Sequence, residues 1–143
     1  MKLISHRGNL LGRIPEQENH PSYIQAAIDH GYDVEIDVWY LDGEFYLGHD
    51  EPQYSITEWW LKQRIDVLWC HAKNADSLHK MLECGLHCFW HQEDRFTLTS
   101  RGIPWCYPNN YITNGITVLH DCGSLVPEDI YGVCTDHPVK WKD

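Results

Sequence analysis

The sequence has few basic residues. Its 143 residues include 11 Lys and Arg against 21 Asp and Glu, which gives a formal net charge of −10 at pH 7. This balance excludes a broad electrostatic surface for nucleic acid or for anionic membranes, so we expect no nucleic-acid partner. An anionic substrate would have to be bound by a few cations gathered at one place.

The sequence also lacks a long hydrophobic run. No stretch comes close to the roughly 20 consecutive apolar residues of a membrane-spanning helix, so we expect no integral membrane segment. The first residues, MKLISHRG, lead directly into a predicted strand without a signal-peptide pattern, and we therefore expect a cytoplasmic protein. The six cysteines are then expected to be mostly buried thiols, because disulfides are rare in a reducing compartment.

One cluster has the ligand types that zinc prefers. Cys84, His87, Cys88 and His91 form a C-x-x-H-C-x-x-H run. Four ligands in so short a segment cannot easily surround one ion tetrahedrally, because some of them point away on a helix end or a strand. We therefore interpret them as ordinary packed side chains, with a structural zinc site as the less favoured alternative.

The length and composition predict one domain that spans residues 1–143. Hydrophobic side chains make up 43% of the sequence and include seven Trp, which is sufficient for one core. Strand and helix signals alternate over the first two thirds, a pattern typical of parallel strands covered by helices. Predicted strands cover residues 2–6, 33–40, 44–49, 67–73 and 86–92.

Helix and turn signals separate these strands. Predicted helices begin after Asn19 and after Asn74, and an S-x-x-E capping box formed by Ser55 and Glu58 predicts a third. An Asp-Gly pair at 42–43 predicts a tight hairpin turn.

The part of the sequence beyond Asp94 predicts only short strands joined by Gly, Pro and Asn. A complete barrel of eight strand-helix units takes about 250 residues, so this chain can supply the strands only if outer helices are lost. We therefore predict an α/β fold, an abbreviated TIM-type (β/α) barrel with several outer helices reduced or missing. A homo-oligomer, in which a second subunit completes the barrel, is an alternative that the sequence does not decide.

Polar side chains lie at the C-terminal ends of the predicted strands. Side chains at i and i+2 share a face, so Glu35 and Asp37 point the same way, as do His71 and Lys73. Two carboxylates inside a buried sheet repel each other unless a cation lies between them, and such oxygen ligands suit Mg²⁺ or Ca²⁺. The alternative is an edge strand on which both carboxylates are solvated.

A pair of histidines lies at two further strand ends. His6 ends the first strand, and His49 closes the hairpin arm. Two imidazoles near neutrality can share the roles of proton donor and proton acceptor. Arg7 and Lys73 would supply the local positive charge that holds a phosphoryl group.

The joint pattern resembles the glycerophosphodiester phosphodiesterase family. The resemblance is carried by SHRGN at 5–9, ENHPSYIQAAIDHGYDVEIDVWYLDGEFYLGHD at 18–50 and TDHP at 135–138. These segments match the family's HRG opening, ENT-like turn, E-x-D strand, DG turn and HD pair in order and spacing. The strong part lies within the first 50 residues.

The resemblance implies a role for each matched residue. His6 and His49 would act as acid and base, and Arg7 would bind phosphate. Glu35 and Asp37 would bind one divalent cation.

The next residues are less direct matches. Glu18 and Asn19 would support the first loop of the site. The family's third metal carboxylate usually opens an E-x-K on a later strand, where this chain has His71, Ala72 and Lys73. His71 would then bind the cation through a ring nitrogen, which weakens affinity for Mg²⁺ or Ca²⁺ and admits Mn²⁺ or Zn²⁺.

The resemblance thus implies a metal-dependent phosphodiester hydrolase of lipid metabolism, acting on a small glycerophosphodiester-like substrate by two-histidine catalysis. One alternative is a lysophospholipid-cleaving relative, in which some of the Trp side chains line an apolar groove. Another is a catalytically silent module that keeps the phosphate pocket. The missing third carboxylate favours that module, whereas both retained histidines speak against it.

Overall fold

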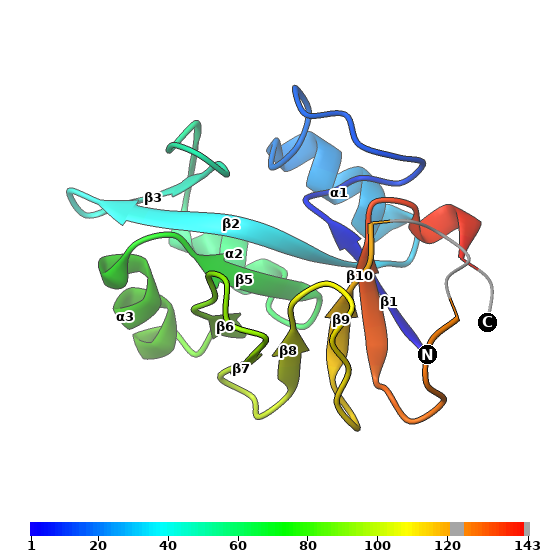
Figure 1. Cartoon of the computed structure of the whole chain (residues 1–143). Helices are drawn as coiled ribbons and strands as arrows, with labels where there is room; N and C mark the ends of the chain where they lie inside the picture. The colour runs from blue at the N-terminus through cyan, green and yellow to red at the C-terminus, as the bar shows by residue number, and fades with distance from the viewer. Residues whose placement is uncertain (121–124, 142–143) are drawn as a thin grey trace.

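The structure, a computed structural model, describes residues 1–120 and 125–141. It has a mixed α/β fold in which ten strands form one curled sheet with few helices (Figure 1). Parallel pairing runs through the sheet in the order β6-β5-β2-β1-β10-β9-β8. These strands are β1 (Lys2–His6), β2 (Asp33–Leu41), β5 (Leu68–Ala72), β6 (Cys88–Phe89), β8 (Pro104–Cys106), β9 (Ile116–Val118) and β10 (Gly132–Thr135).

An antiparallel arm extends from β2. This strand turns at Asp42 and Gly43 and pairs with β3 (Glu44–Leu47), which pairs with β4 (Tyr54–Ile56). The φ angles of the two turn residues are 50° and 80°, as a tight hairpin turn requires, so the predicted turn is confirmed. The chain after β3 carries His49 back to the ends of the parallel strands.

The curled sheet is a half-barrel. β6 pairs with β5 alone, and β7 (Phe96–Leu98) pairs with β8 alone and antiparallel, so the ladder is interrupted between β6 and β7. One backbone hydrogen bond crosses the gap, from the Ser100 amide to the Cys88 carbonyl at 2.8 Å. The predicted α/β class with reduced helices is confirmed, whereas strand pairing does not close the sheet into a full barrel.

The described residues form three α-helices and one short 3-10 turn. Two of the helices follow Asn19 and Asn74, as predicted, and Asn74 accepts a capping hydrogen bond from the Ser77 amide. The elements are α1 (Pro21–Asp29), α2 (Glu58–Gln63), α3 (Ala75–Glu83) and η1 (Pro138–Lys140). Among the described residues, no helix is long and apolar enough to cross a bilayer.

The start of α2 differs from the prediction. Thr57, not Ser55, is its N-cap, and the Thr57 hydroxyl accepts a hydrogen bond from the Trp60 amide at 3.0 Å. Ser55 lies in β4 opposite Tyr46. Because strand pairing fixes Ser55 in an extended conformation, the helix begins two residues later than its capping box suggested.

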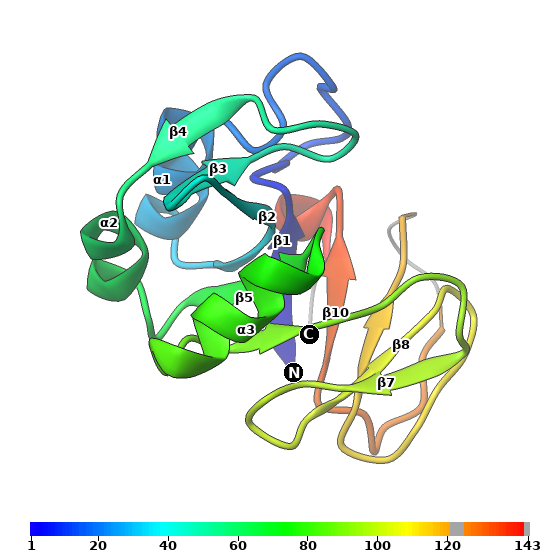
Figure 2. The same cartoon turned by 90° about the vertical axis from the view of Figure 1, so that its left-hand side faces the viewer.

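The three α-helices cover the strands that come from the first part of the chain, and none of them lies over β7, β8 or β9 (Figure 2). Val34, Ile36 and Val38 of β2 are fully buried in the core that contains residues of all three α-helices. The alternate residues Glu35 and Asp37 therefore point to the inside of the curl. A second core fills that inside and consists of Ile4, Trp69, Phe89, Trp105, Ile116 and Cys134.

The cysteines in the described part of the chain are free thiols. Cys70, Cys88, Cys106 and Cys134 are buried, as predicted, and Cys84 is half-buried. Burial raises the pKa of each of these five thiols, which keeps them protonated and unreactive near neutrality. The sixth cysteine, at position 122, lies outside the described residues.

Candidate active site

A cavity of about 320 Å³ opens at the C-terminal ends of the parallel strands. Four strands, β1, β5, β6 and β10, each place one residue in the inner core and have a polar residue two positions later. Alternate residues of a strand share a face, so these polar side chains point to the inside of the curl as well. These polar residues are His6, His71, His91 and Asp136. The cavity is lined by His6, Arg7, Glu35, His49, His71, His91, Gln92, Trp105, Tyr107, Pro108, Val118 and His120.

The two carboxylates of β2 are deeply buried. Glu35 is 3% exposed and Asp37 is not exposed, which excludes the solvated edge strand. Burial and the neighbouring Asp37 charge raise the pKa of Glu35 well above its usual range. Burial also opposes ionisation of Asp37, but His71 and the Arg7 charge outweigh it and hold the pKa of Asp37 below its usual range. Adjacent acidic groups with pKa values pushed apart are typical of functional sites.

His71 faces both carboxylates with one ring nitrogen. Its Nε2 lies 2.7 Å from the backbone carbonyl oxygen of His91, which can only accept, so Nε2 carries a proton. Its Nδ1 lies 3.4 Å from Asp37 Oδ1 and 3.7 Å from Glu35 Oε2, where it can donate to a carboxylate or, when it carries no proton, direct its lone pair at a cation between them. Among the described residues, Glu35 Oε1 and Asp37 Oδ1 have no hydrogen-bond partner.

This donor set fits a divalent cation. Two carboxylates and one imidazole offer atoms that all lie within 4.8 Å of one another. Buried carboxylate oxygens without hydrogen bonds are costly unless a positive charge compensates them. The structure therefore brings together Glu35, Asp37 and His71, the three residues predicted to hold the metal.

Arg7 reaches the same group of residues from a strained turn. Its φ is 60°, and its Nε lies 3.0 Å from Asp37 Oδ2. The Asp37 and Glu35 charges raise the pKa of Arg7 despite its burial, so the guanidinium is permanently charged. The next residue, Gly8, has φ 95°, and a Cβ there would come within 2.7 Å of the Tyr23 ring. The glycine of the HRG sequence is thus required locally, because only glycine permits this turn against α1.

The two predicted supporting residues also lie at this turn. Glu18 Oε1 accepts a hydrogen bond from Arg7 Nη1 at 3.2 Å. The Asn19 side chain donates to Asp37 Oδ2 at 2.9 Å and accepts from the Asp37 amide at 3.0 Å. Asn19 therefore positions the carboxylate of β2 in addition to the loop, which the sequence did not predict.

Lys73 lies at the edge of the site. It follows β5, and its charge offsets part of the rise that burial and Asp37 cause in the pKa of Glu35. The same charge adds to burial and Arg7 in lowering the pKa of His49. It is not among the residues that line the cavity. Its contribution in this structure is thus electrostatic.

His6 and His49 line the same cavity, in different surroundings. Each Nδ1 lies 2.8 Å from a carboxylate, that of buried Asp136 for His6 and that of exposed Asp50 for His49. Burial is the largest cause that lowers the pKa of each, with a further contribution from the Arg7 charge. Lowered pKa values keep both imidazoles largely neutral near pH 7, as a proton acceptor requires.

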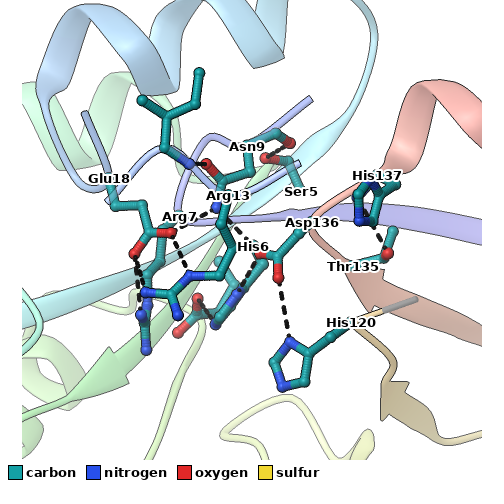
Figure 3. A network of polar contacts seen from close by, with 12 residues as sticks. Ser5, His6, Arg7, Asn9, Arg13, Glu18, His120, Thr135, Asp136 and His137 are labelled. Carbon is teal, nitrogen blue, oxygen red and sulfur yellow. Dashed lines mark hydrogen bonds and ion pairs between the residues drawn. The ribbon is translucent and has the colours of Figure 1, made fainter. Parts of the chain in front are cut away.

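Three further residues at this site, Asn9, His120 and Asp136, were not predicted from the sequence. Asp136 Oδ1 accepts from His6 Nδ1 and from Asn9 Nδ2, and Asp136 Oδ2 lies 3.2 Å from His120 Nδ1 (Figure 3). Asp136 immediately follows β10 and His120 lies two positions beyond the end of β9, so both lie near strand ends, the same signal that identified Glu35 and His71. The TDHP segment was part of the recognised pattern, but no role was assigned to its aspartate.

The zinc alternative is not supported by the side chains of its run. His87 Nε2 lies 2.8 Å from the Thr99 hydroxyl, and His91 Nε2 contacts the Asp94 carbonyl. The described residues offer a second group that could hold a metal ion besides that of Glu35, namely His6, His120 and Asp136, and neither group contains a cysteine.

The chain was also compared with known proteins. No family model, no curated protein and no solved structure matches it.

Proposed function

We propose that this chain is a metal-dependent phosphodiester hydrolase of the glycerophosphodiester phosphodiesterase type, with a reduced TIM-type barrel. One observation carries the proposal: three candidate ligand atoms, two of them carboxylate oxygens without a hydrogen-bond partner among the described residues, converge beside a cavity that also exposes two histidines and an arginine. Glu35 and Asp37 supply two of these atoms and His71 the third.

The metal ligands would be the residues of β2 and β5. A divalent cation bound by Glu35, Asp37 and His71 would act as a Lewis acid toward a phosphoryl oxygen. Mg²⁺ or Ca²⁺ suits the carboxylates, and the imidazole admits Mn²⁺ or Zn²⁺.

The remaining groups would bind and cleave the diester. Arg7 lines the cavity and would hold a non-bridging oxygen, while Lys73 adds positive charge from the edge. His6 and His49 would exchange protons with the nucleophile and the departing alkoxide. A cavity of about 320 Å³ suits a small diester.

The first test is hydrolysis of a glycerophosphodiester by the purified chain, with Mg²⁺, Ca²⁺, Mn²⁺ or Zn²⁺ added in turn. We expect metal-dependent release of the alcohol. His6→Ala and His49→Ala should each lose at least about a hundredfold in rate, the usual scale for general acid-base groups.

His79→Ala is the matched control. His79 lies on the exposed side of α3, where it pairs with Glu83, and this variant should retain the parent rate. The absence of turnover by the parent at saturating concentrations of all four metals would refute the proposal and leave a phosphate-binding module. Undiminished turnover in both histidine variants would refute the assigned roles.

A further inference from the structure

His120 belongs to the cavity, although the proposed function gives it no role. It follows β9 at the mouth of the half-barrel, where its side chain is 53% exposed. Its ring centroid lies 5.5 Å from that of His6 (Figure 3). A ligand in the cavity would therefore find two neighbouring imidazoles.

One buried carboxylate orients both rings. Asp136 is 2% exposed, and each of its two oxygens lies within hydrogen-bond distance of one imidazole. Asn9, which donates to Asp136 Oδ1 at 3.0 Å, fixes this carboxylate further. Because a carboxylate only accepts, the Nδ1 atoms of His6 and His120 donate to it. Nε2 of each ring is then left for proton transfer.

The two flanks of the cavity differ in polarity. The flank of β2 and β5 carries the charged groups, including Arg7 and Glu35. The flank of β8 and β9 carries Trp105, Tyr107 and Val118, with His120 at its end. A diester whose phosphate lies at the charged flank would direct one ester group toward the apolar flank. The alcohol part of that ester would lie beside His120.

We propose that His120 is a catalytic residue of this cavity, the general acid that protonates the oxygen of the departing alcohol. In the step, the nucleophile oxygen forms a new bond to phosphorus and gives its proton to the imidazole of His6 or His49. The bond between phosphorus and the departing oxygen breaks, and its electron pair moves to that oxygen. The same oxygen takes the Nε2 proton of the His120 imidazolium, for which Asp136 is the counter-ion.

This inference rests on the proposed function and refines it. His6 and His49 alone would otherwise have to serve both the nucleophile and the departing group. A general acid has a specific signature, because an alkyl alcohol needs a proton to depart whereas a nitrophenol does not. His120 should therefore matter for one kind of diester and much less for the other.

The test compares His120→Ala and His120→Asn on two substrates with the preferred metal. The asparagine amide can replace Nδ1 as a donor to Asp136, but it has no titratable Nε2. Both variants should slow hydrolysis of an alkyl glycerophosphodiester by at least about a hundredfold and that of bis(p-nitrophenyl) phosphate by less than about tenfold. His79→Ala is again the control and should match the parent on both substrates.

Each other outcome overturns the inference. Equal losses on both substrates would assign His120 a structural role, and recovery in His120→Asn alone would make it a positioning residue. Rates equal to those of the parent would remove it from the reaction. Loss of one of two bound metal ions in His120→Ala would instead assign His6, His120 and Asp136 to a second metal site. A parent inactive on both substrates would refute the proposed function itself, which distinguishes the two failures.

Discussion

The acidic side chains at the cavity lie in two regions on either side of His6: Asp136 in the β10 region, and Glu35 and Asp37 in the β2 region. The carboxylates of the two regions differ in their hydrogen-bond partners. On the β10 side, Asp136 is within hydrogen-bond distance of His6, Asn9 and His120. On the β2 side, Glu35 and Asp37 each keep one buried oxygen without a hydrogen-bond partner in the described part of the chain. All three carboxylates are almost completely removed from solvent.

The difference separates a positioning carboxylate from candidate metal ligands. Burial opposes ionisation of Asp136, but its hydrogen bonds to His120 and His6 outweigh this and hold its pKa far below the usual range. Burial and the Asp37 charge instead raise the pKa of Glu35. Because a buried carboxylate oxygen without a partner is costly, Glu35 and Asp37 are better candidates for metal ligands than Asp136, whose two oxygens both have protein partners.

The largest effect is expected from the β2 region. Glu35→Gln and Asp37→Asn should each reduce turnover at least about a thousandfold, because a bound cation contributes several kcal/mol of transition-state stabilisation. Calorimetric titration should show that both variants have lost divalent-cation affinity, whereas Asp136→Asn retains it. Equal loss of affinity in Asp136→Asn would break the comparison, since both regions would then hold metal.

A smaller effect is expected from the β10 region. Asp136→Asn should reduce turnover about a hundredfold, because an amide can no longer fix the Nδ1 protons of His6 and His120. The measurement is kcat at saturating metal, combined with the cation affinity of the same variant. A lowered rate with unchanged affinity would sharpen the comparison, and an unchanged rate would remove Asp136 from the reaction.

The β2 region was predictable from sequence because its signals are local. Glu35 and Asp37 lie two positions apart on one strand, and Gly8 and Asn19 belong to a short recognised pattern around Arg7. The strands other than β4, and two of the three α-helices, follow from similarly local patterns.

The β10 region was not predictable in the same way. The partner of His6 is 130 positions away, and only the parallel pairing of β1 with β10 brings Asp136 beside it. The gap between β6 and β7 was not predictable either, because the contact across it, the backbone hydrogen bond from Ser100 to Cys88, belongs to no strand ladder. The start of α2 was misplaced because Ser55 and Thr57 both can cap a helix, and strand pairing decides between them.

The smallest expected effect is a pH dependence of stability, and it comes from a comparison of two buried imidazoles, those of His87 and His6. His87 is buried beside Thr99 and has no carboxylate partner within residues 1–120 and 125–141, and burial and the Arg101 charge lower its pKa to about 4. Between the ordinary value of 6.5 and about 4, the unfolded chain binds a proton that folded His87 does not, so stability should fall as pH falls through this window. His87→Gln should flatten this dependence, measured as the urea unfolding free energy of parent and variant across the same pH range. If the unfolding free energies of parent and variant changed with pH in the same way, folded His87 would accept the proton without cost. The contrast with His6, whose imidazole has the carboxylate of Asp136 as a partner, would then not hold.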